Sequence, residues 1–324
     1  MTEYQFTSFD LRAMQAWSLR HKLEVARNKI KEWYDYFHGN VYVAFSGGKD
    51  STVLLDLVRD MYPDVPAVFV DTGLEYPEVR NFVKSFTNIE IIKPSISFKQ
   101  VIELYGYPLI SKQVAHKIYT ARNTPNGIVS TQYFKKESEH FKKYGRQFSY
   151  HQWAWLKDTD IKIGDQCCRV MKKNPVKRYE RKTKRAPFLA LLAEESANRK
   201  MTWQKYGCNA FHAQRPVSNP LSIWTEQDIL EYIVYFGIPY CSIYGEVIQD
   251  KNGKYKTTGV ERTGCIYCGF GIHQEKEPNR FQKLKKSHPH IWNYCMKSSE
   301  CGGLGMKDIF EKMNASGNVA IHYE

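Results

Sequence analysis

A segment near the N-terminus carries residues suited to binding phosphate. After an apolar run at 41–45, the chain reads Ser-Gly-Gly-Lys-Asp-Ser-Thr over 46–52. Glycines let the backbone approach a ligand, and the N–H groups at the start of a helix attract phosphate. Hydroxyls and a lysine charge add donors, in a pattern that differs from a Walker loop. The candidate phosphate-loop residues are Ser46, Gly47, Gly48, Lys49, Asp50, Ser51 and Thr52.

Four of the eight cysteines form two pairs with the spacing of metal ligands. Cys167 and Cys168 are adjacent, and Cys265 and Cys268 form a Cys-x-x-Cys motif. Two such pairs supply the four thiolates of a zinc or iron–sulfur site. Zinc ribbons usually contain two Cys-x-x-Cys motifs about 15–20 residues apart. Here the first pair is adjacent and is not a Cys-x-x-Cys motif. The spacing predicts a metal site and leaves zinc, an iron–sulfur cluster and no metal as alternatives.

The elements that must position these residues alternate between helix and strand. Apolar residues at helical spacing predict helices, and short apolar runs between turn signals predict strands. The expected helices lie at 18–37, 52–61, 77–86, 98–105 and 225–236, and the expected strands at 41–45, 67–70, 89–92 and 188–192. This alternation predicts an α/β fold, doubly wound around a mostly parallel sheet that helices cover on both faces.

The positive charge of the chain is concentrated in one segment. Residues 112–185 contain 19 Lys and Arg but 6 Asp and Glu, which accounts for the whole net charge of +13. Such a segment suits nucleic acid or a polyphosphate ligand, and a solvated lysine-rich face is the alternative. Aromatic residues there are candidates for base stacking, with core packing as the alternative. They are Tyr133, Phe134, Tyr144, Phe148 and Trp153.

Length and composition limit the class of protein. With 324 residues, 42% of them hydrophobic, the chain is long enough for a folded core. It has no run near the roughly 20 apolar residues of a membrane span, and no signal-peptide core. We expect no membrane association and a cytoplasmic location. We divide the chain into a helical segment at 1–37, a nucleotide domain at 38–240 with a basic insertion at 112–185, and a cysteine-bearing segment at 241–324 packed on it.

The loop at 46–51 resembles the Ser-Gly-Gly-x-Asp-Ser loop of the PP-loop family, also called adenine nucleotide alpha hydrolases. Within that family the chain is similar to the PAPS reductase branch over about 18–296. Asp71-Thr72-Gly73 resembles its Asp-Thr-Gly segment, which implies that these residues contact the adenosine. Glu195-Ser196-Ala197-Asn198-Arg199 resembles its Glu-Ser-x-x-Arg segment. That implies that Glu195, Ser196 and Arg199 belong to the nucleotide site and that Arg199 reaches toward the phosphates.

The cysteines strengthen this resemblance. An adjacent pair followed at a distance by Cys-x-x-Cys resembles the [4Fe–4S] site of adenylyl-sulfate reductases, which implies that the four paired cysteines hold that cluster, with zinc as the alternative. Glu300-Cys301-Gly302-Gly303-Leu304 is similar to the Glu-Cys-Gly-Leu-His tail that carries the catalytic cysteine of sulfonucleotide reductases. Here an extra glycine intervenes and no histidine follows. Cys301 is therefore a candidate nucleophile.

Three functions compete on these grounds. The first is an ATP pyrophosphatase that adenylates a target for sulfur transfer. The iron–sulfur ATP-pyrophosphatase of DNA phosphorothioation systems and tRNA thiolation enzymes are similar cases, with DNA or tRNA and a sulfur-donor protein as partners. The second is a reductase of adenylyl sulfate or PAPS that uses Cys301. The third is a non-catalytic nucleotide or nucleic-acid binding module.

Two charged residues of the phosphate loop favour the first function. A carboxylate beside phosphate is useful chiefly when a cation bridges the two, so Asp50 predicts Mg²⁺ at the leaving pyrophosphate. Lys49 is expected to offset charge on the α-phosphate of ATP or another adenine nucleotide. We therefore predict Lys49 and Asp50 as catalytic residues, and Cys301 in their place if the protein is a reductase.

Overall fold

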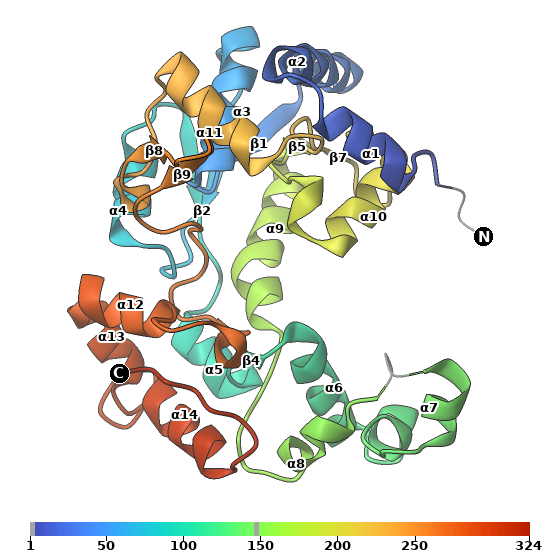
Figure 1. Cartoon of the computed structure of the whole chain (residues 1–324), viewed down its shortest axis with the longest axis vertical. Coiled ribbons are helices and arrows are strands. Elements are labelled where there is room, and N and C mark those ends of the chain that lie inside the picture. The colour runs from blue at the N-terminus through green and yellow to red at the C-terminus, as the bar shows by residue number, and fades with distance from the viewer. Residues whose placement is uncertain (1–3, 146–148) are drawn as a thin grey trace. The chain divides into compact units, whose positions relative to one another are not determined.

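The computed structural model describes residues 4–145 and 149–324, and the chain forms two compact units (Figure 1). The first unit contains Met1–Asp71, Glu75–Lys93 and Pro175–Thr263, and the second contains Thr72–Leu74, Pro94–Asn174 and Gly264–Glu324. Residues 241–263, which the sequence placed at the start of a C-terminal segment, thus belong to the first unit. Phe148, a candidate stacking residue, lies outside the described residues.

A six-stranded sheet forms the centre of the first unit. Its strands are β1 (Val41–Ala44), β2 (Ala67–Val70), β3 (Ile89–Ile92), β5 (Ala186–Phe188), β6 (Asn209–Ala210) and β7 (Val217–Ser218). Their order is β3-β2-β1-β5-β7-β6, and every neighbouring pair is parallel except β6 with β7. Val43 pairs with Ala67 on one side and with Phe188 on the other. The expected α/β fold with a mostly parallel sheet is confirmed.

Helices cover both faces of this sheet, because side chains alternate along each strand. Val41 and Val43 point into the larger core, which includes buried residues of α2 (Leu19–Tyr36), α3 (Lys49–Met61) and α11 (Glu226–Phe236). Tyr42 points to the opposite face and packs on Tyr179 of α9 (Asn174–Thr183), with ring centroids 5.1 Å apart. Sequence periodicity therefore decides which helices lie on which face.

The remaining elements of the first unit surround the sheet. They are α1 (Ser8–Gln15), α4 (Pro77–Lys84), α10 (Ala197–Tyr206) and a hairpin of β8 (Val247–Gln249) with β9 (Tyr255–Thr257). None of the helices in the described part of the chain is long and apolar enough to span a membrane.

The second unit is mainly helical. Its helices are α5 (Phe98–Tyr105), α6 (Lys112–Asn123), α7 (Glu139–Tyr144), α8 (Ala154–Lys157), α12 (Arg280–Ser287), α13 (Pro289–Met296) and α14 (Met306–Ala315). Strand β4 (Leu109–Ile110) pairs in parallel with β10 (Gly269–Phe270). This short pairing joins the middle of the chain to the segment that follows the Cys-x-x-Cys motif.

Most of the expected elements are confirmed, with shifts at their ends. The helix expected from residue 52 begins at Lys49, because Gly48 is its N-cap. The strand expected at 188–192 instead covers 186–188, because β1 pairs with it at these three residues and β7 pairs with it only at Phe188. The basic segment, where the sequence showed no clear periodicity, contains α6, α7, α8 and α9.

Candidate functional site

The loop between β1 and α3 has the shape of a phosphate-binding turn. Gly47 has φ +71°, and a Cβ there would lie 2.7 Å from Val83 and 2.8 Å from Val79, so both its conformation and its surroundings require glycine. A Cβ on Gly48 would lie 3.2 Å from the Thr263 hydroxyl and 3.3 Å from the Tyr244 hydroxyl. The first N–H groups of α3 follow directly, and such groups attract anions.

Hydroxyl groups hold this turn in place. The Ser51 Oγ donates to the Gly48 carbonyl at 2.9 Å and lies 3.0 Å from the Ser46 Oγ. The Thr52 Oγ1 also donates to the Gly48 carbonyl, at 3.0 Å. Ser51 and Thr52 are buried. In this structure both residues shape the loop from inside.

Lys49 is bound by its own chain. Its side chain is 6% exposed, and its ammonium lies 2.9 Å from the Glu261 carbonyl and 3.0 Å from the Glu226 carboxylate. Its backbone amide donates to the Tyr244 hydroxyl at 3.2 Å. A buried ammonium needs such partners, since an unpaired buried charge is costly. Glu226 and Glu261 therefore bind the Lys49 ammonium, and Tyr244 accepts from its amide. The sequence assigned both of these groups to phosphate.

Asp50 is the least satisfied charged group of the loop. Burial raises the pKa of its carboxyl group, while the Lys49 charge opposes that shift. Its Oδ1 is buried, and no described residue donates a hydrogen bond to it. A hard carboxylate oxygen without a partner is a suitable ligand for Mg²⁺. The residues present thus fit the metal ion that the sequence predicts.

The Asp-Thr-Gly segment begins at the carboxyl end of β2. The Asp71 Oδ2 accepts a hydrogen bond from Arg80 at 2.9 Å, whereas its Oδ1 is buried without a donor among the described residues. Thr72 and Gly73 belong to the second unit. There the Thr72 Oγ1 accepts from the Leu74 amide at 3.1 Å, and Gly73 has φ +74°.

The Glu-Ser-x-x-Arg segment places Arg199 beside a second arginine, Arg262, because both pair with Glu195. Ser196 caps α10 by accepting from the Arg199 amide at 3.3 Å. Glu195 forms ion pairs with both Arg199 and Arg262. Burial lowers the pKa of Arg199, and the neighbouring Arg262 charge lowers it further, while Asp50 opposes the shift. Both arginines also lower the pKa of Asp50, so this cluster and the phosphate loop are electrostatic neighbours.

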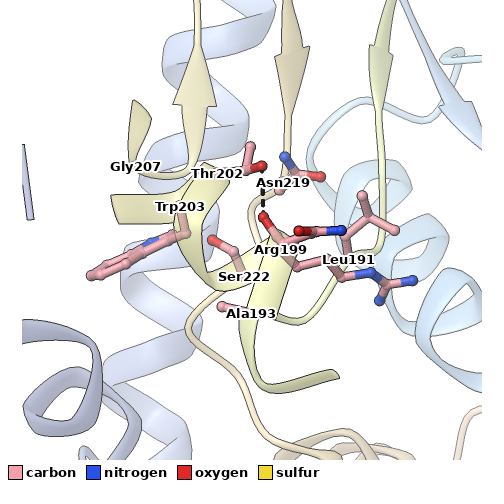
Figure 2. A pocket seen from close by; sticks show the side chains of 9 residues that line it. Leu191, Ala193, Arg199, Thr202, Trp203, Gly207, Asn219 and Ser222 are labelled. Carbon is pink, nitrogen blue, oxygen red and sulfur yellow. Dashed lines mark hydrogen bonds between the residues drawn. The ribbon is translucent and has the colours of Figure 1, made fainter. Parts of the chain in front are cut away.

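A cavity of about 140 Å³ adjoins Arg199 at the carboxyl ends of β5 and β7 (Figure 2). In Figure 2, Arg199 and Trp203 extend from α10 in opposite directions. Asn219 also lines the cavity, and its buried Oδ1 has no donor in the described part of the chain. In parallel α/β sheets, ligands bind outside the carboxyl ends of the strands. The cavity lies at that end of the sheet.

All four paired cysteines lie in the second unit. A hydrogen bond with Cys168, then burial, raises the pKa of Cys167, and the charges of Cys268 and Cys265 add to that shift. The Cys167 hydrogen bond lowers the pKa of Cys168 to about 5, with help from Lys112. The four thiols are thus electrostatic neighbours, although across 4–145 and 149–324 no three Cys, His, Asp or Glu side chains are arranged to hold a metal ion.

The remaining cysteines differ in exposure. Cys301 is exposed on a turn in the second unit, where its amide donates to the Ser298 carbonyl at 3.1 Å. Cys208, Cys241 and Cys295 are buried free thiols. An exposed thiol is available to a substrate or an oxidant, which the buried thiols are not.

A family model covers most of the chain. The phosphoadenosine phosphosulfate reductase domain matches residues 40–118 and 126–269. This chain belongs to that family. The expected resemblance to the PAPS reductase branch is therefore confirmed, and the match includes the phosphate loop, the Glu195–Arg199 segment and the paired cysteines.

Several proteins are similar to parts of the chain. The phosphoadenosine 5'-phosphosulfate reductase of Alkalilimnicola ehrlichii is 33% identical over 25% of this chain and 36% of its own length. An uncharacterized protein of Methanocaldococcus jannaschii is 24% identical over 82% of this chain and 49% of its own length. The chain therefore spans about half of that longer relative. The crystal structure of the Candida auris PAPS reductase has a TM-score of 0.38 and 15% identity, over 74% of this chain and 98% of that one.

The sequence did not predict the residues of this family member that cover the phosphate loop. Tyr244, Glu261, Arg262 and Thr263 lie about 200 positions from the loop, and no spacing rule connects them to it. One signal was present. A basic residue and a threonine, Arg262 and Thr263, directly precede the Gly-Cys of the Cys-x-x-Cys motif.

Proposed function

We propose that this chain is an ATP pyrophosphatase that adenylates a substrate for sulfur transfer, with nucleic acid as the sulfur acceptor. The observation that carries the proposal is the buried, unpaired Oδ1 of Asp50 beside the buried ammonium of Lys49. In this reaction a substrate oxygen bonds to the α-phosphorus, the α–β phosphoanhydride bond breaks, and pyrophosphate leaves. Membership in a sulfonucleotide family supports an enzyme that acts on an adenine nucleotide.

Each part of the site has a role in this proposal. The first amides of α3 and the Lys49 ammonium bind the phosphates. Asp50 holds Mg²⁺, which when bound neutralises charge on pyrophosphate. The other nucleotide contacts come from Ser46, Gly47, Gly48, Ser51, Thr52, Asp71, Thr72, Gly73, Glu195, Ser196 and Arg199. Within the loop, Lys49 exchanges the Glu261 carbonyl for a phosphate oxygen.

The sulfur chemistry rests on the second unit and the basic segment. Cys167, Cys168, Cys265 and Cys268 are proposed to hold a [4Fe–4S] cluster, with zinc as the alternative, since four neighbouring thiols suit both. Residues 112–185 are proposed to bind DNA or tRNA, because they carry the net charge of the chain. A sulfur-donor protein completes the proposed partners.

A sulfonucleotide reductase is the second candidate. Relatives with that name favour it, including the adenosine 5'-phosphosulfate reductase of Halalkalibacterium halodurans, 27% identical over 26% of this chain and 39% of its own length. The exposed Cys301 is then the nucleophile that attacks the sulfur of adenylyl sulfate or PAPS. The third candidate is a nucleotide or nucleic-acid binding module without catalysis.

Two substitutions separate these functions. Anaerobically purified protein is incubated with ATP or with adenylyl sulfate, and pyrophosphate and sulfite are assayed. Asp50→Asn is expected to reduce pyrophosphate release by at least about a hundredfold, as removal of a charge-stabilising group does. Cys301→Ser is expected to leave that release near the wild-type rate. Sulfite as the product, with Cys301 essential and Asp50 dispensable, would show a reductase, and neither product would favour the binding module.

A further inference from the structure

The segment 259–263 of the first unit lies over the phosphate loop. Tyr244 joins the two, since its hydroxyl accepts from the Lys49 amide and lies 2.9 Å from the Thr263 hydroxyl. Its backbone carbonyl accepts from the Gly259 amide at 2.8 Å, and the Lys49 ammonium reaches the Glu261 carbonyl. Contacts at both ends therefore hold the segment against the loop, with Arg262 between them.

Charges around the loop are balanced without a nucleotide. The cations are Lys49, Arg199 and Arg262, and the carboxylates are Asp50, Glu195 and Glu226. Each carboxylate partner of these cations is supplied by the chain. A nucleotide brings several more negative charges, so the cations must exchange partners when its phosphates arrive.

Arg262 is the cation best placed to make that exchange. Its side chain is 65% exposed, whereas Glu195 is 14% exposed and the Lys49 side chain 6%. Solvent screens an ion pair with so exposed a partner, so breaking it costs little. Its guanidinium group also offers the forked set of donors that matches a phosphate.

We propose that Arg262 is a phosphate-binding residue of the nucleotide site, which Glu195 holds beside Arg199 until the nucleotide binds. This inference rests on the proposed function, because it assumes that the loop binds an adenine nucleotide. On binding, Arg262 leaves Glu195 and donates to a phosphate oxygen. Arg199, whose side chain is less exposed than that of Arg262, stays paired with Glu195. The phosphates are then bound from two parts of the chain, the loop at 46–52 and Arg262, which follows the loop by more than 200 positions.

Calorimetric binding of ATP, AMP and adenosine to the full-length chain tests this role. Arg262→Ala is expected to weaken ATP binding by about tenfold to a hundredfold, the usual effect of losing a hydrogen bond to a charged group. AMP binding should weaken less and adenosine binding should not change. Arg262→Lys should restore part of the loss. The matched control is Arg27→Ala, which removes an arginine from the surface ion pair with Asp60 of the same unit.

Two outcomes would overturn the proposal while the proposed function stands. Unchanged ATP binding in Arg262→Ala would show that Arg262 does not touch phosphate. An equal loss for ATP and adenosine would show that Arg262 only fixes the segment 259–263. In both cases Lys49→Ala should still weaken ATP binding, which would show that the loop is the nucleotide site. Wild-type protein that binds no adenine nucleotide would overturn both proposals.

Discussion

At the scale of single residues, Asp50 shows how a functional group can oppose folding. One oxygen of its partly buried carboxylate, Oδ1, is buried and has no donor among the described residues. Such groups usually persist where a ligand completes them. Lys49 differs, because its chain provides a carbonyl and a carboxylate for its ammonium. The sequence predicts that both residues lie at the phosphates. It does not predict that Lys49 has partners within the chain while the Asp50 Oδ1 lacks one.

Asp50→Asn is expected to stabilise the protein in the absence of metal and nucleotide. Burial raises the Asp50 pKa, so the folded state binds its proton more tightly than the unfolded state. Ionised Asp50 therefore lowers the free energy of unfolding at neutral pH, and this loss is relieved as the pH falls through the raised pKa. The variant should gain about 0.5–2 kcal/mol at pH 7, measured by urea unfolding. The gain should shrink in acid.

The control for that measurement is Asp60→Asn, which changes an exposed carboxylate in an ion pair with Arg27. It should alter stability little at either pH. A less stable Asp50→Asn variant at pH 7 would mean that the carboxylate is already paired in the folded protein, and the metal-ligand role would lose its support.

At the scale of elements, the sheet was predictable and its cover was not. Short apolar runs predict β1 and β2 because parallel strands are buried on both faces. Helix α9 was missed because its buried side is narrow, with Pro175 and Tyr179, and its other residues are mostly basic. The segment 259–263 was missed for another reason. It meets the phosphate loop through single hydrogen bonds between distant residues, and periodicity carries no information on such contacts.

The paired cysteines yield a prediction about two elements of the second unit. Cys168 directly precedes the short helical turn Arg169–Lys173, and Cys265 and Cys268 close a turn in which the Cys268 amide donates to the Cys265 carbonyl at 3.1 Å. A cluster would join these segments and thereby stabilise the unit. Anaerobic protein should be brown, and Cys268→Ser should remove the colour and lower the melting temperature. Cys301→Ser, which changes an exposed thiol of the same unit, should do neither. Colourless protein with one zinc per chain would exclude the cluster.

At the scale of the whole molecule, charge is distributed very unevenly. The segment 112–185 carries a surplus equal to the net charge of +13, so the rest of the chain is neutral. Part of this surplus lies on the exposed side of α9, where Lys177, Arg181 and Lys182 are exposed. Composition predicted the surplus, but only the structure shows that these three basic residues lie on the exposed side of one helix of the first unit.

Reversal of charge on α9 should weaken nucleic-acid binding. The triple variant Lys177→Glu, Arg181→Glu, Lys182→Glu is expected to lose at least about tenfold in affinity and to reduce the salt slope by about 2–3, because it removes phosphate contacts. Filter binding of DNA and tRNA between low and moderate salt measures both quantities.

A matched variant separates position from net charge. Lys251, Lys254 and Lys256 lie on the β8–β9 hairpin and are exposed. Their change to Glu alters the net charge by the same amount but should leave binding nearly intact. Equal losses in the two variants would show that total charge, and not α9, governs the interaction.

The contact between Lys49 and the Glu261 carbonyl also bears on how the protein is made. The two residues lie 212 positions apart in the chain. At a synthesis rate of about 5–20 residues per second, the ribosome takes about 10–40 s to add the second after the first. During that interval the nascent chain has its glycine loop, but Tyr244 is added only near the end, and Arg262 and Thr263 follow Glu261. The loop of the growing chain therefore stays uncovered until the last quarter of the chain is being made.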